Sequence, residues 1–516
     1  MPRPIAPALK YIARWLVLAC FLPAGGAWGA LEDWAARGWV TDFEAGMMEA
    51  ARSERPAFVY FHAPWCSWCQ VYERDTLRHP RVEAALKARF VPVVVDFDAR
   101  SDLVRRYGAK GLPYTVLLGP DGKVWNAFVG ILRPDDLLAV LDELLARGGP
   151  VEAPAVDGRV AAAAGAGLEA YRRFRRAWLD HVASLYDAEL GTLAGSYATG
   201  AGLKRPSPLT WIYLERHRLW TARAARAARV ERARLQDAAD GGFFNFLDPH
   251  REDEYAETSK LLEANAWMIA WQAHRAWEGA ARRSARAGIG FLRRRLWNPA
   301  GGGFWQALVA VPGYGTLSVA ERRRRPPPVL RIQRADTNAQ AAWALAEAAV
   351  LLRDRDTLAL ARRGLAFVLS GLWHEGRLYH FRQGGDYVLP DPVEDRLWVL
   401  AAAGALRAAG VAPPGPGRLA RLAARARDWY SAAARNGMGL DVPLVSLAAW
   451  VAADPAWGVP RRHLEGMLAR LRIEADTPPD DVVLGLLAWE RYLWREGIFP
   501  GKDRYRKHGR ERLQPR

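Results

Sequence analysis

The spacing of apolar residues changes along this chain of 516 residues and divides it into two large regions. Within residues 30–148, short apolar runs that suit buried strands alternate with helical segments. Within residues 168–500 the strand pattern is gone, and apolar residues recur every three or four positions, as along one face of a helix. Residues 149–167 are rich in Ala, Gly and Pro, which predicts a linker between the two regions.

The first region is predicted to be an α/β domain. Its expected strands are residues 58–62, 90–97, 116–118 and 123–129, and a closing helix is expected over 134–145. After the first strand, Cys66 and Cys69 form a Cys-x-x-Cys pair that leads into a helical segment, which is typical of a thiol redox domain. A zinc site is the alternative, but it needs four clustered ligands, and the chain has no second cysteine pair.

Two motifs in this region resemble thioredoxin. The first is Phe-x-Ala-x-Trp-Cys-x-x-Cys, which ends at Cys69, and the second is Tyr-Gly-x-x-Gly-x-Pro, which ends at Pro113. The resemblance implies that Cys66 attacks a disulfide, that Cys69 resolves the mixed disulfide, and that Pro113 is a cis-proline facing the pair. The substrate contacts expected from the same resemblance are Trp65, Trp68, Leu112 and Pro113.

The place of Cys66 at a helix N-terminus has a chemical consequence. Unpaired N–H groups and the helix dipole favour a thiolate there, and the attacking sulfur is expected to be partly exposed. Cys69, one helical turn later, is expected to be more buried. Tyr60 is a departure from thioredoxin, which has a buried proton-accepting aspartate six residues before the first cysteine. His62, Glu73 and water are the candidate replacements.

The second region is predicted to contain six helical hairpins. Apolar helices are expected at residues 209–220, 260–273, 338–352, 393–408, 443–453 and 481–494. Arg-rich helices are expected before them, at 168–187, 220–237, 278–297, 355–372, 416–435 and 461–472. Helices that are apolar all round belong inside and amphipathic basic helices outside, so the six pairs predict an all-α (α/α)6 toroid. An open solenoid is the alternative, although the usual short repeat periods do not fit.

A thioredoxin-like domain followed by such a toroid resembles the spermatogenesis-associated thioredoxin-domain family, whose C-terminal part is glycosidase-like. Residues 241–243 and 260–266 are similar to that family's Gly-Gly-Phe and Glu-Lys-Met-Leu-x-x-Asn-Ala segments. The His-x-Glu that the family has just before its lysine reads Glu-Thr-Ser here, at residues 257–259. Toroid sugar enzymes need paired carboxylates or histidines at inner-helix N-termini, so this loss argues against turnover of a sugar.

Several residues are nevertheless candidates for a site in the toroid. They are the acids Glu257, Glu263, Asp336, Asp391, Glu394, Asp395, Asp480 and Asp481, the histidines His250, His374 and His380, and the tryptophans Trp267, Trp343 and Trp398. The tryptophans could line a central depression and grip a ligand. The competing interpretation is structural, because acids near helix starts commonly cap the helix, loop histidines are often incidental, and tryptophans at helical spacing are often core.

The N-terminus has the composition of a secretory signal peptide, predicted over residues 1–29. Arg3, Lys10 and Arg14 precede or flank the apolar run 15–22, and small residues follow it. An uncleaved membrane anchor is the alternative, but the apolar run is shorter than the roughly 20 residues that span a bilayer. The protein is therefore expected to be periplasmic or secreted, where disulfide chemistry operates.

The chain is strongly basic, with a formal charge of +17, and 65 of its 73 basic residues are arginines. Residues 149–516 carry +16 of this charge. A basic loop is predicted at residues 322–328 and a basic tail at 501–516, and either could contact an anionic membrane surface. No phosphate-binding loop or nucleic-acid fold signature is present, so no nucleic-acid partner is expected.

These patterns predict an exported thiol–disulfide oxidoreductase that uses no cofactor. Its partner is expected to be a protein disulfide or dithiol, and the toroid is expected to hold that client or a glycan. The alternatives are a glycan-binding or glycan-active toroid with an accessory thioredoxin module, and a binding scaffold without turnover. The presence of Cys66, Cys69 and Pro113 together favours the oxidoreductase.

Overall fold

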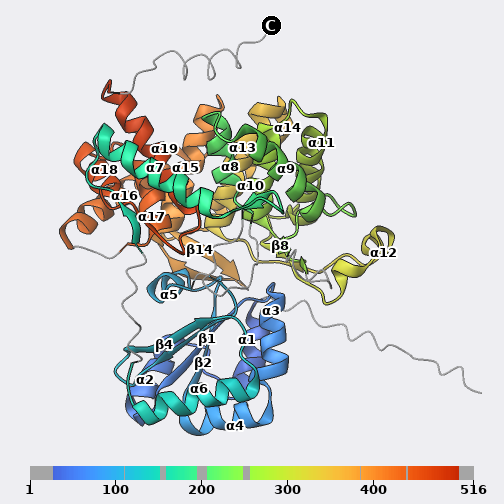
Figure 1. Cartoon of the computed structure of the whole chain (residues 1–516), viewed down its shortest axis with the longest axis vertical. Helices are drawn as coiled ribbons and strands as arrows, with labels where there is room; N and C mark the ends of the chain where they lie inside the picture. Colours follow the sequence, from blue (N-terminus) through green and yellow to red (C-terminus); the bar gives the residue numbers. More distant parts are fainter. Residues whose placement is uncertain are drawn as a thin grey trace, which may run out of the picture.

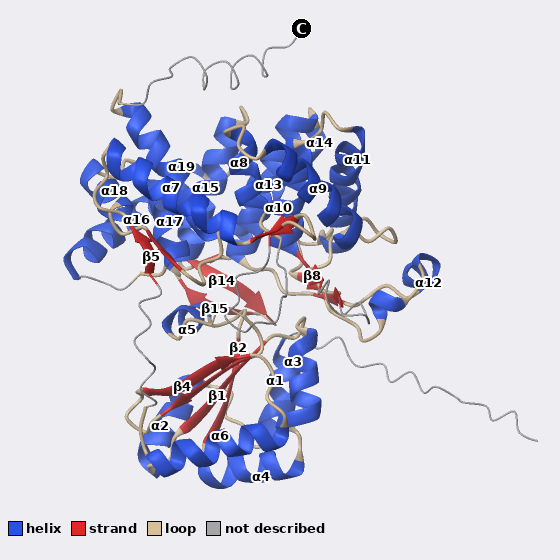
Figure 2. Ribbon diagram, in the orientation of Figure 1, coloured by secondary structure: helices blue, strands red, loops and turns tan. Residues whose placement is uncertain are grey.

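The structure is a computed structural model that describes residues 27–109, 111–150, 159–193, 206–247, 256–383, 385–436 and 440–498. Most of the expected signal peptide, the basic tail and His250 lie outside these residues. The described chain forms an α/β domain and a larger, mostly helical domain that lie against each other (Figure 1). Short strands lie at the junction between them (Figure 2). No helix among the described residues is long and apolar enough to cross a bilayer.

A four-stranded sheet in the order β2-β1-β3-β4 forms the centre of the first domain. Its strands are β1 (Ala57–His62), β2 (Val91–Asp96), β3 (Tyr114–Leu118) and β4 (Val124–Val129). β1 is parallel to β2 and antiparallel to β3, and β4 is antiparallel to β3. The helices are α1 (Ala27–Ala36), α2 (Phe43–Ser53), α3 (Ser67–Tyr72), α4 (Pro80–Arg89), α5 (Ser101–Arg106) and α6 (Pro134–Arg147). This topology confirms the predicted thioredoxin-like fold.

The central strand β1 is buried along its whole length because helices cover both faces of the sheet. Successive side chains of a strand point to opposite faces, so Phe58 and Tyr60 enter one core while Val59 and Phe61 enter the other. The first core is closed by α4 and α6, and the second by α2 and α5. β1 thereby holds a fixed position for the Cys-x-x-Cys segment that follows it.

Among the described residues, twelve helices of the second domain form a ring of two concentric layers. The inner helices are α8 (Pro208–Arg216), α10 (Leu262–His274), α13 (Ala335–Leu352), α15 (Val393–Ala408), α17 (Val442–Ala452) and α19 (Asp480–Arg495). The outer helices are α7 (Leu168–Ser184), α9 (Thr221–Leu235), α11 (Gly279–Phe291), α14 (Arg355–Gly371), α16 (Pro416–Asn436) and α18 (Arg461–Leu468). Each inner helix contacts the next, and α19 contacts α8. The ring is therefore closed, as predicted for a toroid and unlike an open solenoid.

The second domain is mostly helical, as predicted, and it also contains short strands that the sequence did not indicate. Its short strands are β5 (Arg159–Ala162), β6 (Tyr186–Asp187), β7 (Thr192–Leu193), β8 (Phe246–Leu247), β9 (Ala256–Glu257), β10 (Lys260–Leu261), β11 (Ala307–Leu308), β12 (Val329–Leu330), β13 (Trp373–His374), β14 (Arg377–Gln383), β15 (Asp386–Pro390) and β16 (Arg472–Glu474). Most have two residues, which is too short for an alternating pattern to show in the sequence.

Two predicted irregular segments have regular structure. β5 lies in the segment predicted as a linker, but it pairs with β16 and so belongs to the helical domain. The basic segment predicted as a loop, residues 322–328, begins within α12 (Val319–Arg324), a helix that starts with a capping box formed by Ser318 and Glu321. Arg322 of α12 forms an ion pair with Asp237, at 3.3 Å between Nε and Oδ1. Capping and ion pairing together explain why this charged stretch is ordered.

The centre of the ring is filled by tryptophan side chains. Trp343 packs edge-on against Trp267 with ring centroids 5.4 Å apart, and it stacks on Trp450 at 5.5 Å. Trp398 lies 6.0 Å from Trp343. Trp267, Trp343 and Trp398 are each at most 9% exposed. The expectation that these three line an open depression is therefore wrong, because they pack on one another as core.

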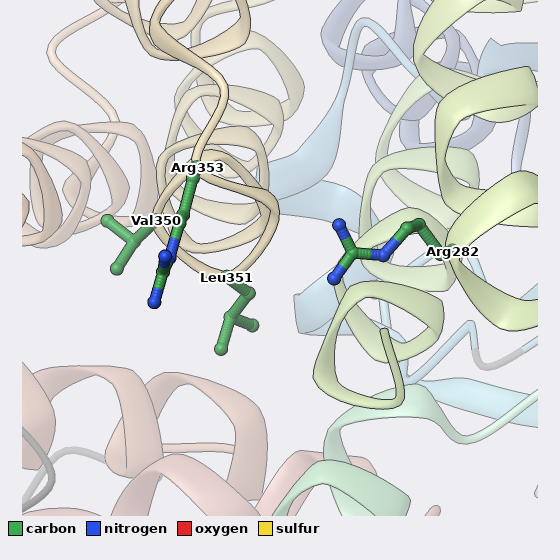
Figure 3. Close-up of a pocket in the computed structure, with 4 residues that line it drawn as sticks. All are labelled: Arg282, Val350, Leu351 and Arg353. Atoms are coloured by element: carbon green, nitrogen blue, oxygen red, sulfur yellow. The ribbon is translucent and has the colours of Figure 1, made fainter. Parts of the chain in front are cut away.

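The two ends of α13 lie in different surroundings. α13 begins beside the first domain with Asp336 in its first turn, where a negative charge complements the helix dipole. Its 18 residues span about 27 Å to the opposite end of the ring. A cavity of about 430 Å³ lies at that far end, lined by Arg282, Val350, Leu351 and Arg353 (Figure 3). The arginine-lined cavity is thus remote from the acids at the domain junction.

Candidate functional site

The cysteine pair lies at the start of α3, directly after the turn that follows β1. Cys66 is the N-cap residue of α3, and its Sγ accepts the backbone N–H of Cys69 at 3.1 Å. Both cysteines are free thiols. The peptide bond between Leu112 and Pro113 is cis. The local arrangement is the one that the resemblance to thioredoxin implies, with a thiol at the helix N-terminus.

The burial of Cys66 differs from the expectation. Cys66 is 3% exposed and Cys69 is fully buried, so the attacking sulfur is not partly exposed in this arrangement. Burial raises the pKa of the Cys66 thiol well above its ordinary value, and the neighbouring Cys69 and Glu257 raise it further. The effect of the helix N-terminus, which would favour the thiolate, is outweighed here.

Glu257 of the helical domain explains part of this difference. Its Oε2 accepts the backbone N–H of Ser67 at 3.1 Å and also the Ser67 hydroxyl. A carboxylate from the second domain therefore caps the Cys-x-x-Cys helix and takes an N–H group at its N-terminus. Glu257 is 1% exposed, and burial raises the pKa of its carboxyl group.

The predicted substrate contacts are covered by the helical domain. Trp65 is 6% exposed, and its indole Nε1–H donates to Asp98 Oδ2 at 2.8 Å. The Trp65 carbonyl lies 3.4 Å from the backbone nitrogen of Ala310 in the second domain. Trp68 and Leu112 are half-buried against the same apolar core, and Pro113 is buried. Trp65, Trp68 and Leu112 thus lie in the same apolar core as the two thiols.

The two domains share an apolar core at this junction. Side chains of the second domain that pack against the first domain's core are Leu261, Ala307, Leu330, Ile332 and Phe381. Each of them is at most 6% exposed. The junction is therefore a packed interface. Its buried apolar surface contributes stability of roughly 25 cal/mol per Å² removed from water.

A hydrogen-bonded group of three side chains lies behind Cys69. Glu73 Oε1 accepts the Tyr60 hydroxyl at 3.0 Å and lies 2.9 Å from His62 Nδ1. The Tyr60 hydroxyl also interacts with the Cys69 thiol, and burial raises the pKa of Tyr60 well above its ordinary value. The two residues proposed as replacements for the missing aspartate are thus joined to each other, and Tyr60 links them to the resolving cysteine.

His62 is charged at neutral pH in this group. Burial alone would lower its pKa, but the hydrogen bond and charge of Glu73 raise it to about 9. The imidazolium therefore stabilises the fold fully below the unfolded value of about 6.5, and this stabilisation is lost as pH rises through about 9. We expect the His62 contribution to the free energy of unfolding to fall by about 3 kcal/mol over that interval.

Urea unfolding at a series of pH values measures this contribution as the difference between the wild-type chain and His62→Gln. The variant should lose stability near neutral pH and show a weaker decline toward alkaline pH. Two curves that stay parallel between about pH 6 and about pH 9 would contradict the charged pair.

A buried ionic cluster lies on the other side of the dithiol, where the β2–α5 loop meets the ring. Arg334 bonds Asp336 through two nitrogens, at 2.6 and 3.1 Å, and it also pairs with Asp98 of the first domain. His380 Nε2 lies 2.8 Å from the Asp98 carbonyl, and its Nδ1 lies 2.8 Å from Asp395. All five residues are at most 9% exposed. A loop of the first domain therefore closes the end of the ring.

Asp336, His380 and Asp395 are close enough to share a cation, since their ligand atoms lie within 4.8 Å of one another. Both nitrogens of His380 face acceptors, however, so the ring is protonated and offers no lone pair to a metal. Burial would lower the pKa of His380, but Asp395 and Asp336 raise it to about 8. The donor set in this arrangement suits an ion-pair network and not a metal.

The other candidates from the sequence have simpler places. Asp480 caps α8 by accepting the N–H groups of Leu209 and Thr210, and Asp391 pairs with Arg425. His374 is exposed and stacks on Tyr387 at 4.5 Å. The structural interpretation holds for these residues. It is wrong for His380, which was expected in an incidental loop and is fully buried in the ionic cluster.

Asp98, Arg334 and Arg105 are the residues of this junction that the sequence did not single out. Arg105 of α5 pairs with Glu394 of α15, and burial raises the pKa of that Glu394 carboxyl group. Asp98 and Arg334 are 236 positions apart. No local pattern joins residues at such separations, so only the docked arrangement of the domains shows the pairing.

Comparisons with known proteins agree with the fold of the first domain. Residues 38–120 match the family described as thioredoxin-like. Mitochondrial thioredoxin of Bos taurus is 38% identical over 93 residues, which are 18% of this chain and 54% of that protein. The thiol:disulfide interchange protein DsbD 1 of Pseudomonas aeruginosa is 32% identical over 87 residues, which are 16% of this chain and 15% of that protein. This chain thus spans about half the length of the curated thioredoxin it matches.

Solved structures match each domain separately. A thioredoxin from Thermus thermophilus aligns with 22% of this chain and 89% of its own length, at 28% identity and a TM-score of 0.21. Cellobiose 2-epimerase from Spirochaeta thermophila aligns with 63% of this chain and 99% of its own length, at 12% identity and a TM-score of 0.46. The first domain is thus similar in sequence to thioredoxins.

Proposed function

We propose that this protein is a thiol–disulfide oxidoreductase and that Cys66 and Cys69 are its redox pair. The observation that carries the proposal is the placement of Cys66 Sγ as the N-cap of α3, 3.1 Å from the Cys69 nitrogen. Two thiols one helical turn apart can close a disulfide without moving the fold. The similarity of residues 38–120 to thioredoxins supports the same chemistry.

The exchange proceeds in two balanced steps. The Cys66 thiolate attacks one sulfur of a client disulfide, an S–S bond forms between Cys66 and the client, and the other client sulfur leaves as a thiolate that takes up a proton. Cys69 then loses its proton and attacks Cys66 Sγ, which releases the second client thiolate. Two electrons pass from the dithiol to the client, and the reverse sequence oxidises a client dithiol.

Tyr60 and Glu73 support proton removal from Cys69 in the second step. The Tyr60 hydroxyl interacts with the Cys69 thiol and donates to Glu73 Oε1 at 3.0 Å. A proton that leaves Cys69 can pass through the hydroxyl to the Glu73 carboxylate, which is half-buried and lies 2.9 Å from His62 Nδ1. This group would do the work of the single buried aspartate that thioredoxin places at the position of Tyr60.

A redox titration tests the proposal. The wild-type chain is equilibrated in buffers of graded thiol and disulfide content, free thiols are alkylated, and the modified peptides are identified by mass. One reversible disulfide between Cys66 and Cys69 is expected. A pair that stays reduced in the most oxidising buffer, or oxidised in the most reducing one, would refute the redox assignment.

The site of action and the partner follow as part of the proposal. An exported, periplasmic or secreted protein would meet client disulfides, and the N-terminal composition supports export. The order of the two domains also supports a place in the spermatogenesis-associated thioredoxin-domain family. Glycan binding by the toroid stays a prediction, and the packing of Trp267, Trp343 and Trp398 against one another gives it no support.

A further inference from the structure

Glu257 is the side chain of the helical domain that hydrogen-bonds to Ser67, the residue next to Cys66. It is the last residue of β9, where it pairs with Phe246 of β8, and it lies 190 positions from the residue it contacts, Ser67. Its second oxygen, Oε1, lies 3.3 Å from the backbone nitrogen of Ser259, which orients the carboxyl group. An acid that is 1% exposed and held by three donors is a fixed part of the site and not a mobile surface charge.

The position of Glu257 opposes the chemistry of Cys66 in two ways. It takes the Ser67 N–H at the start of α3, a group that would otherwise help to stabilise a thiolate at the helix N-terminus. Its negative charge also disfavours a second negative charge on the neighbouring sulfur. A carboxylate at this place makes the docked protein less reactive, whereas a redox protein needs a thiolate to attack.

Access to the sulfur gives a second, independent reason. An attacking thiolate must approach a client disulfide directly, but Cys66 is 3% exposed and Trp65 beside it is 6% exposed. The backbone nitrogen of Ala310, from the helical domain, lies 3.4 Å from the Trp65 carbonyl, directly before Cys66 in the chain. No client disulfide can reach Cys66 while the two domains keep this arrangement.

The docked arrangement is held by groups at its edge that can separate. Arg105 and Glu394 form an ion pair across the junction, and their side chains are 22% and 29% exposed. Such a pair contributes modestly and can be exchanged for water when the domains part. The junction therefore combines a buried centre with a polar rim, as do interfaces that open and close.

We propose that Glu257 is a positioning residue supplied by the helical domain, which holds Cys66 in a covered, unreactive state, and that withdrawal of Glu257 as the domains part activates the dithiol. The proposal rests on the proposed redox function and adds its regulation. The domains then exist in two states, and a client disulfide shifts the balance because it binds only the open one. The helical domain acts in this way as a lid on its own redox site.

Alkylation of Cys66 by iodoacetamide tests the proposal without any client. The rate constant is measured between about pH 6 and about pH 9 for the wild-type chain, Glu257→Gln, Glu257→Ala and Arg105→Gln. Glu321→Gln is the matched control, because Glu321 is an exposed acid of the same domain that bonds only to Ser318 around it. Labelled peptides separate Cys66 from the other cysteines.

The wild-type chain and Glu321→Gln should react slowly and alike. Glu257→Gln should react at least about tenfold faster than the wild-type chain near neutral pH, since one pKa unit changes the thiolate fraction tenfold. The pH at which its rate begins to rise should also be lower than in the wild-type chain. Arg105→Gln should accelerate the reaction at every pH without moving the profile, because it loosens the junction and leaves Glu257 in place. Arg105→Gln keeps the test valid even if the chains with a substitution at the buried Glu257 fail to fold.

Equal alkylation rates of Cys66 in all five proteins would overturn the proposal that the helical domain covers Cys66. A wild-type rate as high as that of an unfolded peptide would do the same. These outcomes leave the redox titration of Cys66 and Cys69 untouched, so a failure of the lid is distinct from a failure of the redox assignment. Conversely, faster alkylation of Glu257→Gln together with a pair that cannot be oxidised would support the lid and refute the oxidoreductase.

Discussion

Replacing Cys66 with serine is expected to abolish catalysis of disulfide exchange. A hydroxyl does not form a mixed disulfide, and its pKa is far too high to supply an anion near neutral pH, so no first step remains. In the dithiothreitol-driven reduction of insulin, the Cys66→Ser chain should give the uncatalysed rate. The structure places no other described thiol except Cys69 near the site, and Cys69 is fully buried behind Cys66.

Ser370→Ala is the matched control, because Ser370 is an exposed serine of α14 that bonds only to carbonyls of its own helix. It should retain the wild-type rate of insulin reduction. If Cys66→Ser retained more than a small fraction of that rate while folded, Cys66 would not be the attacking sulfur.

Replacing Arg334 with methionine is expected to cause a large loss of stability. The guanidinium group is at the centre of the ionic cluster, where it pairs with Asp98 and Asp336, and their charges raise its pKa. Methionine fills a similar volume but leaves Asp98 and Asp336 buried without the guanidinium group that pairs with both. Breaking a buried ion pair from one side costs about 3–5 kcal/mol, because the remaining charge is uncompensated.

Arg331→Met is the matched control, since Arg331 is exposed and lies three positions earlier in the same segment. Urea unfolding of both variants, followed by tryptophan fluorescence, gives the comparison. Arg331→Met should change the free energy of unfolding by less than about 0.5 kcal/mol. A loss below about 1 kcal/mol for Arg334→Met would show that the cluster is hydrated and that the junction is open in solution.

The fold was largely predictable from the sequence, because its signals are local. The Cys-x-x-Cys segment and the motif that ends at Pro113 indicate the thioredoxin-like domain. Helical periodicity placed all twelve helices of the ring within a few residues of their observed bounds, for example α15 at Val393–Ala408. The short strands were missed, since two residues carry no periodicity, and they depend on pairing with distant segments.

The site was predictable only in part, for a different physical reason. Cys66, Cys69 and Pro113 share a local motif, whereas Glu257 contacts Ser67 across 190 positions and His380 contacts the Asp98 carbonyl across 282. These contacts arise from the docking of two domains, which leaves no trace in the spacing of either one. The prediction of a partly exposed Cys66 with a lowered pKa is wrong for the same reason. The carboxylate that caps α3 comes from Glu257, 190 positions away from Ser67, and no local pattern indicates it.

Trapping of a mixed disulfide tests the central claim most directly. The Cys69→Ala and Cys66→Ala chains are each incubated with a disulfide-bonded peptide, and the adducts are mapped by mass. If Cys66 attacks and Cys69 resolves, Cys69→Ala should accumulate the peptide on Cys66, while Cys66→Ala should hold almost none on the buried Cys69. Equal adducts in both variants, or no adduct on Cys66 in Cys69→Ala, would contradict the assignment of the redox pair.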